Sequence, residues 1–225
     1  MATSFKYIDR GKMARAVLLP GWATDYHIFD KLDIAYNYLV PNVIDIDDFF
    51  ACLARNLEWA DATLIGWSFG GILGAHFMAK HPDLIKKAVF IGVKNGYSAG
   101  EIGRMKKYVE TDIKAYLDGF YRKCFRGNNS ADIDWFNSDL KKRYLKNPDT
   151  GALIRQLDFL KDNPLPEERL IGYVGRIKFA HGANDAIVNI QEAASVKENL
   201  PGVVFNRLEG VGHPAFLHPD FGFMV

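Results

Sequence analysis

The chain has 225 residues and a formal net charge of +1, with 48% hydrophobic and 24% charged residues. This length suits one domain, or a core domain with an insertion, and the composition is that of an ordinary globular protein. No apolar stretch approaches the roughly 20 residues that cross a bilayer. The first residues lack the apolar core of a secretory signal, so we expect a cytoplasmic protein with no membrane partner.

The cysteine and histidine pattern argues against two classes of site. Cys52 and Cys124 form no C-x-x-C motif, and we expect both to be reduced and structural. No Cys/His cluster has the spacing of a zinc site, and the sequence has neither a P-loop nor a G-x-G-x-x-G after a strand. We therefore expect no metal, no other cofactor and no nucleic-acid partner.

The first part of the chain alternates between short apolar runs and helical patterns. The runs predict strands, the second of them interrupted by Pro41, at residues 14–19, 38–43, 62–65 and 87–93. Helical spacing predicts one helix from a cap at Asp47 or Asp48 to about Leu57, and another at 71–80. This alternation predicts parallel strands joined by helices.

Residues 95–172 have a different pattern, which is polar, aromatic and helical. The segment is longer than an ordinary connection between strands, so it predicts an inserted helical cap. The earlier pattern then resumes with an expected strand, helix and strand at residues 176–180, 189–199 and 203–208. We predict an α/β fold with a mostly parallel central sheet, in which residues 1–94 and 173–225 form the core.

Charge is distributed unevenly along the chain. Residues 104–161 contain 13 Lys and Arg against 8 Asp and Glu, a net charge of +5 that the remaining residues almost balance. Such a segment is either the solvated face of several helices or a surface for an acidic partner or a negatively charged substrate. The sequence leaves both interpretations open.

The motif Gly66-Trp67-Ser68-Phe69-Gly70 says most about function. It follows an expected strand and precedes an expected helix. In this context G-x-S-x-G is a nucleophile elbow, a sharp turn that presents the serine hydroxyl above the sheet. The glycines allow the backbones on either side to approach closely. The motif alone is weak, so a base, an acid and an oxyanion hole must accompany it.

Candidates for the acid and the base follow Ser68 along the chain, in the order known from one class of enzymes with a nucleophile elbow. A serine hydroxyl needs a histidine to take its proton, and that histidine needs a carboxylate to hold its tautomer. His213 lies in a glycine-rich loop after the last expected strand, and Asp185 follows the strand expected at 176–180. We predict Ser68, Asp185 and His213 as a catalytic triad. His218 is the rival base, and the remaining histidines are expected to be structural: His27, His76, His81 and His181.

The oxyanion of an acyl-transfer intermediate needs two backbone N–H donors. We expect Phe69 to supply one and Trp22, in the loop after the first expected strand, to supply the other. The alternative is that Pro20-Gly21 is only a turn and Trp22 only a core aromatic residue. The rings of Trp22 and Trp67 are also candidates for the walls of an apolar acyl pocket.

With these motifs the chain resembles the α/β-hydrolases over nearly its whole length. Within them it is similar to the esterases of biotin synthesis that cleave pimeloyl-[acyl-carrier protein] methyl ester. The motifs that carry the resemblance are Leu18-Leu-Pro-Gly-Trp22, Leu64-Ile-Gly-Trp-Ser-Phe-Gly-Gly71, His81-Pro82 and His213-Pro-Ala-Phe-Leu-His-Pro219. The resemblance implies an α/β-hydrolase fold, an acyl-enzyme on Ser68, and His213 that protonates the departing methanol and then activates water.

The same resemblance gives the basic segment a role, because carrier proteins of this kind are acidic. Its candidates for binding the substrate or the carrier are Arg122, Lys123, Arg126, Lys141, Lys142, Arg143 and Arg155. Two features depart from the family: Pro20 replaces the usual histidine, and the Asp-x-x-Gly-x-Gly-x-Ser stretch before the elbow is missing. We expect a monomer that acts on a carrier-linked or a small ester.

Two other functions use the same residues. A general hydrolase of small carboxylesters, thioesters or C–C bonds would have the same fold and triad, because the substrate depends on the cap and the pocket. A ligand-binding protein of this fold would need no chemistry. The order of Ser68, Asp185 and His213 argues against the binding protein, which failure of a fluorophosphonate to label Ser68 would favour.

Overall fold

The computed structural model describes residues 2–57 and 61–225, and within them a seven-stranded sheet forms the centre of the molecule. The strand order is β1-β3-β2-β4-β5-β6-β7. The strands are β1 (Ser4–Ile8), β2 (Ala14–Leu19), β3 (Tyr36–Val43), β4 (Ala62–Trp67), β5 (Ile85–Ile91), β6 (Ile177–Gly182) and β7 (Val204–Leu208). Strand β1 pairs antiparallel with β3, and the other neighbouring strands pair in parallel, so the predicted α/β class with a mostly parallel sheet is confirmed.

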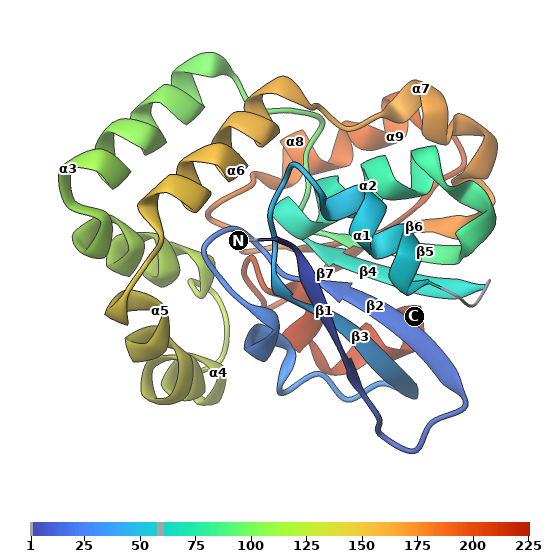
Figure 1. Cartoon of the computed structure of the whole chain (residues 1–225), viewed down its shortest axis with the longest axis horizontal. Helices are drawn as coiled ribbons and strands as arrows, with labels where there is room; N and C mark the ends of the chain where they lie inside the picture. Colours follow the sequence, from blue (N-terminus) through green and yellow to red (C-terminus); the bar gives the residue numbers. More distant parts are fainter. Residues whose placement is uncertain (1, 58–60) are drawn as a thin grey trace.

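Helices cover the sheet and also extend to one side of it (Figure 1). The α-helices are α1 (Phe49–Asn56), α2 (Phe69–Lys80), α3 (Ala99–Cys124), α4 (Ser130–Trp135), α5 (Lys142–Lys146), α6 (Thr150–Asp162), α7 (Glu167–Leu170), α8 (Ile190–Ala194) and α9 (Val196–Asn199). The 3₁₀ and π turns are η1 (Tyr26–Phe29), η2 (Pro82–Leu84), η3 (Phe136–Lys141), η4 (Ile171–Arg176), η5 (Ala215–Leu217) and η6 (Pro219–Met224). Helices α3 to α6 lie beside the sheet, whereas the division of the chain into a core and a cap stays a prediction.

The central strands are apolar because both faces of the sheet are covered. All residues of β4 are buried, which is typical of a central strand in a parallel sheet. Side chains alternate between the two faces of a strand. Leu64 faces α2, where a Cβ on Gly74 would contact it, and Trp67 faces the other side, where its ring packs on Phe216 of η5.

Two local expectations are wrong. Pro41 does not interrupt β3, because the parallel partner β2 pairs only as far as Leu39 and Pro41 lies opposite Phe5 of β1. Asp48 precedes α1, but its side chain does not cap the helix. Its carboxylate instead accepts the Thr3 N–H at 3.1 Å, which ties α1 to β1. This N-terminal strand was not predicted from the sequence.

The long helix α3 changes direction at Asp112, where φ is −156° and ψ is 90°. The Asp112 carboxylate accepts the Ala115 N–H at 3.0 Å, so it caps the second half of the helix. The second half packs against Trp22 through Tyr116 and Phe120. The bend therefore divides α3 into two helical halves, of which the second lies against the residue that follows β2.

Candidate active site

The predicted triad and Trp22 all follow parallel strands at their carboxyl ends. Trp22 follows β2, Ser68 follows β4, Asp185 follows β6 and His213 follows β7. Since β2, β4, β6 and β7 run in the same direction, these loops meet at one edge of the sheet. The topology thus brings together residues that lie far apart in the sequence.

Ser68 occupies a strained turn between β4 and α2, with φ at 55° and ψ at −120°. A residue other than glycine in this region costs about 1–3 kcal/mol, and such strain clusters at functional sites. A Cβ on Gly66 would collide with Gly70 O, and one on Gly70 would collide with Leu19 O, so the turn requires both glycines. The Ser68 N–H donates to Ile91 O at 2.7 Å, which fixes the turn to β5.

Asp185 is held by its own loop after β6. Its Oδ1 accepts the N–H groups of Ile187 at 2.7 Å and Val188 at 2.9 Å. Burial alone would raise the pKa of this carboxyl, but His213, His181 and the Val188 N–H together outweigh burial, and the pKa is lowered. The side chain is fully buried, so the structure keeps a charged carboxylate inside the protein next to a histidine.

His213 is bound to Asp185 by a hydrogen bond of 2.6 Å between Nδ1 and Oδ2. An ionised carboxylate only accepts, so Nδ1 carries the proton and Nε2 of the neutral ring is an acceptor. His213 is completely buried, and its Nε2 has no hydrogen-bond partner among the described residues. A buried acceptor without a donor is uncommon and calls for a functional explanation.

The backbone of His213 is tied to two other elements. Its N–H donates to Cys124 O at the end of α3, at 3.0 Å. Its carbonyl accepts the indole N–H of Trp67 at 3.0 Å, and the Trp67 ring lies 5.3 Å from the imidazole. The loop that carries the imidazole is therefore held from both the helical segment and the sheet.

His181 is a second buried histidine beside Asp185. Its Nε2 lies 3.0 Å from Val188 O and 3.6 Å from Asp185 Oδ2. Burial lowers the pKa of His181, although Asp185 acts in the opposite direction. A neutral ring that donates to Val188 O supports the turn that holds the carboxylate, as expected for a structural histidine.

The two expected oxyanion donors come from two neighbouring segments, the loop after β2 and the start of α2. Phe69 is the first residue of α2, whose first N–H groups have no partner within the helix. Gly70, the residue after it, is in close contact with the carbonyls of Leu19 and Pro20, so the loop before Trp22 lies against the start of α2. Trp22 is buried, and its indole N–H donates to Leu153 O at 3.0 Å.

A cavity of about 250 Å³ lies above Ser68. Its lining combines aromatic and apolar side chains with charged groups, and consists of Trp22, Ser68, Tyr97, Glu101, Arg104, Met105, Tyr108, Tyr116, Phe120, Lys123, Leu160 and Ile187. Most of these residues come from α3. The helical spacing of Tyr116, Phe120 and Lys123 was a usable sequence signal for one face. The part contributed by Arg104 and Tyr108 depends on the bend at Asp112.

The predicted substrate-binding residues are two tryptophans and a set of basic residues from the helical segment. Trp22 lines the cavity, whereas Trp67 lies under the His213 loop and is not part of the lining. Arg122 and Lys141 both pair with Asp118, at 3.0 and 2.5 Å. Ion pairs thus occupy part of the basic segment. Arg143 pairs with Asp25, while Arg126, Lys142 and Arg155 are exposed.

The other histidines do not join the triad. His218 begins η6 and accepts the Asp220 N–H at 3.1 Å, so it acts as a helix cap. His76 Nε2 lies 2.9 Å from Pro164 O, and His81 packs on Phe77. His27 contacts Asp30 at 3.0 Å. These contacts assign each ring a local structural partner.

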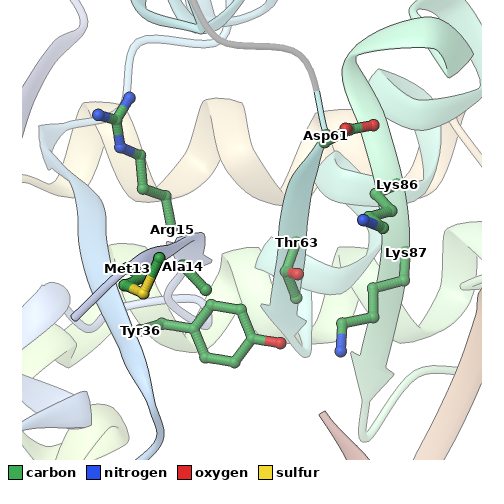
Figure 2. A pocket seen from close by; sticks show the side chains of 8 residues that line it. All are labelled: Met13, Ala14, Arg15, Tyr36, Asp61, Thr63, Lys86 and Lys87. Carbon is green, nitrogen blue, oxygen red and sulfur yellow. The ribbon is translucent and has the colours of Figure 1, made fainter.

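A second hollow of about 410 Å³ lies at the opposite edge of the sheet, where the parallel strands begin (Figure 2). Its lining residues include Arg15, Tyr36, Thr63 and Lys87, and the Lys87 ammonium lies 5.5 Å from the Tyr36 ring. None of the predicted site residues lines it. The candidate chemistry therefore belongs to the smaller cavity above Ser68.

Residues 2–57 and 61–225 contain neither a candidate membrane-spanning helix nor a candidate metal-binding cluster. No helix there combines the length and apolar character that spanning a membrane requires. No group of three or more His, Cys, Asp or Glu side chains there is arranged to hold a metal ion. Both cysteines are buried and free.

A family model described as "alpha/beta hydrolase fold" matches residues 20–150, more than half of the chain. The chain belongs to this family. Among solved structures, the bromoperoxidase from Bacillus anthracis has a TM-score of 0.81 at 19% identity, and covers 99% of this chain and 93% of its own. The esterase from Exiguobacterium antarcticum has a TM-score of 0.78 at 18% identity, with 96% and 90% covered. The predicted α/β-hydrolase fold is confirmed.

Curated relatives of this alpha/beta hydrolase also match. The "Pimeloyl-[acyl-carrier protein] methyl ester esterase" of Vibrio atlanticus is 22% identical over 213 residues, which are 82% of this chain and 81% of that protein. Four proteins with this name match at 20–23% identity. The predicted resemblance to this group of hydrolases is therefore confirmed.

Proposed function

We propose that this alpha/beta hydrolase is a serine carboxylester hydrolase that forms an acyl-enzyme on Ser68. The observation that carries the proposal is the 2.6 Å hydrogen bond between Asp185 and His213 Nδ1, which leaves a buried, unpartnered acceptor at Nε2. In a site built this way the imidazole is already oriented and has the tautomer that a general base needs. The strained Ser68 turn supports the role of nucleophile.

The proposed reaction has two steps. Ser68 Oγ attacks the ester carbonyl while His213 Nε2 takes its proton, and the N–H groups of Trp22 and Phe69 stabilise the oxyanion. The intermediate collapses, His213 protonates the departing alcohol, and the acyl group stays on Ser68. A water molecule then attacks the acyl-enzyme with His213 as base, which releases the carboxylic acid and restores the serine.

The proposed substrate is the methyl ester of a pimeloyl group attached to an acyl-carrier protein. The relatives' names support this substrate. The cavity also suits an acyl chain, since its aromatic walls offer an apolar surface for the chain to pack against. The cationic groups of Arg104 and Lys123 suit an anionic arm such as a phosphate. We propose that residues 95–172 act as the cap that receives the carrier.

The experiment that tests the chemistry compares wild type with Ser68→Ala on two substrates, carrier-bound pimeloyl methyl ester and p-nitrophenyl acetate. We expect Ser68→Ala to lose at least 10³-fold in kcat on both, because the nucleophile is gone. Ser138→Ala, which removes a surface serine bonded to Trp135 O, is the matched control and should keep wild-type rates. A fluorophosphonate should label wild type and not Ser68→Ala.

The second comparison tests the substrate. Wild type, but not Ser68→Ala, should restore growth of a biotin auxotroph that lacks its pimeloyl methyl esterase. If wild type hydrolyses only the small ester and fails to restore growth, the protein is a general esterase and the carrier proposal is wrong. If fluorophosphonate does not react with wild type, the protein binds ligands without this chemistry.

Docking of an acidic carrier predicts a dependence on salt. Exposed charges interact over about 8–10 Å at physiological ionic strength, and added salt weakens the attraction. Reversing two exposed charges, Arg126→Glu with Arg155→Glu, should lower kcat/KM for the carrier-bound ester about 5–10-fold at low salt and less at 0.5 M salt. Lys80→Glu at the end of α2 is the control. Equal effects of both variants would contradict docking on the helical segment.

A further inference from the structure

Residues 22–25, here called the oxyanion loop, are held by three helices of the segment between β5 and β6. Trp22 donates its indole N–H to Leu153 O of α6 at 3.0 Å, and Tyr121 of α3 donates its hydroxyl to Ala23 O at 2.5 Å. Asp25 accepts the Tyr144 hydroxyl of α5 at 3.0 Å. The loop therefore has partners on three separate helices of this segment.

The backbone of this loop is strained at its centre. Ala23 has φ at 60°, a left-handed conformation that residues other than glycine rarely adopt. Within the loop, Thr24 contributes bonds from its N–H and hydroxyl to Gly21 O, at 3.3 and 2.9 Å. Strained conformations persist where the surroundings hold them. The bond from Tyr121 acts on the carbonyl of Ala23 itself, one residue after Trp22.

Tyr121 is a rigid donor. Its side chain is buried and packs on the rings of Phe136, 5.3 Å away, and Tyr144, 5.9 Å away. Burial raises the pKa of Tyr121, so its hydroxyl keeps the proton that it donates. The neighbouring pair between Arg143 and Asp25 is half-exposed, and exposed pairs contribute little. Tyr121 therefore attaches the loop at its strained residue through a rigid, buried side chain.

We propose that Tyr121 is a positioning residue that holds Ala23 in its left-handed conformation, so that the Trp22 N–H stays directed at the oxyanion. Tyr121 itself touches no reacting atom. This inference rests on the proposed function, because it assumes that Trp22 serves the reaction of Ser68. It gives the helical segment a part in the chemical step in addition to substrate binding.

The test is Tyr121→Phe, which removes one hydroxyl and keeps the ring. The control is Tyr38→Phe in β3, whose equally buried hydroxyl donates to a different backbone carbonyl, Leu32 O, at 2.9 Å. We expect Tyr121→Phe to lower kcat on p-nitrophenyl acetate about 5–30-fold with KM within twofold, because loss of a full oxyanion donor costs about 10²–10³-fold. Tyr38→Phe should lower the melting temperature and keep kcat.

A tetrahedral analogue separates positioning from a general loss of structure. A trifluoromethyl ketone forms an oxyanion on the serine, so its affinity for Tyr121→Phe should fall by the same factor as kcat. The affinity for the product carboxylate should not change. Adding Ala23→Gly should restore part of kcat, because glycine adopts a left-handed conformation readily. No rescue, or an equal loss for both ligands, would overturn the proposal.

Two further variants keep the outcome clear. If Tyr121→Phe does not fold, Tyr144→Phe removes the hydroxyl bond to Asp25 and should lower kcat about 2–5-fold; unchanged kcat there overturns the proposal. Ser68→Ala is measured in parallel. An inactive Ser68→Ala beside a fully active Tyr121→Phe overturns only the role of Tyr121, whereas an active Ser68→Ala overturns the proposed function itself.

Discussion

Two parts of the molecule meet at the Ser68 cavity. The part here called the floor is the set of strand-end loops that carry Ser68, Asp185 and His213, of which Ser68 and Ile187 line the cavity, and the part here called the roof consists of side chains from α3 and α6. Floor side chains are buried and fixed by short hydrogen bonds and by glycines that tolerate no Cβ. Roof side chains such as Arg104 and Tyr108 are exposed, and ion pairs at the surface hold their helices. A buried, tightly held floor suits fixed chemistry, and a solvated roof suits variable recognition.

The largest expected effect comes from comparing a carboxylate of the floor with a carboxylate of the roof. Asp185→Asn should lower kcat about 10³–10⁴-fold, because an amide in place of the carboxylate favours the wrong histidine tautomer. Asp158→Asn in the roof, where the carboxylate pairs with Lys106 at 2.9 Å, should leave kcat within twofold. Steady-state kinetics on p-nitrophenyl acetate measure both. Comparable losses in the two variants would contradict the separation of floor and roof.

The next largest effect is on stability, and it compares a glycine of the floor with a glycine of the roof. Gly70→Ala places a Cβ against the carbonyls of Leu19 and Pro20, which are backbone groups that cannot turn aside, so the free energy of unfolding should fall by about 2–3 kcal/mol. Gly103→Ala in α3 meets no atom within 4 Å and should raise it by about 0.5–1 kcal/mol. Urea unfolding measures both values. A tolerated Gly70→Ala would show that the elbow is less tightly packed.

The smallest effect concerns the junction between floor and roof. The buried Lys94, just after β5, bonds Glu101 of α3 at 2.7 Å and Glu192 of α8 at 3.1 Å. Lys94→Met should lower the free energy of unfolding by about 1–2 kcal/mol, because it removes a buried charged bond but leaves carboxylates that water can reach. Lys106→Met, which breaks a surface pair between α3 and α6, is the control with a smaller expected loss.

The Lys94 contribution should depend on pH at both extremes. Burial alone would raise the pKa of Glu101, but its bonds to Lys94 and Ser98 lower it from 4.5 to about 2. Burial alone would lower the pKa of Lys94, but the two glutamates raise it above 10.5. The difference between wild type and Lys94→Met should therefore be full between about pH 4.5 and 10.5. It should shrink toward pH 2 and above pH 10.5, and a constant difference would contradict this assignment.

Local sequence patterns predicted the floor because each of its motifs consists of residues that are close together in the sequence. The apolar run before Ser68, the glycines around it and the order of Asp185 and His213 are all readable along the chain. The local patterns did not predict β1 or the role of Asp48. Strand β1 depends on its pairing with β3, and the Asp48 carboxylate bonds to Thr3, 45 positions away. The carboxylate serves a tertiary contact, and local capping rules do not describe it.

The roof was predicted as helical and basic, but its lining was not. The bend of α3 at Asp112 decides that Arg104 and Tyr108 meet the same cavity as Tyr116. Which cations remain exposed also depends on partners, as Arg122 shares Asp118 with Lys141. Spacing along one helix does not contain this information, because the cavity forms only where separate helices pack.

The sequence by itself determined the strand–turn–helix at Ser68, the parallel α/β pattern and the chain order of the three predicted site residues, because these depend on local apolar periodicity and on glycines at tight turns. Only the tertiary structure decided that His213 is buried against Asp185 and that Tyr121 bonds to Ala23 O. Those contacts join residues 28 and 98 positions apart in the chain, and their geometry is set by how the sheet and the helical segment pack together.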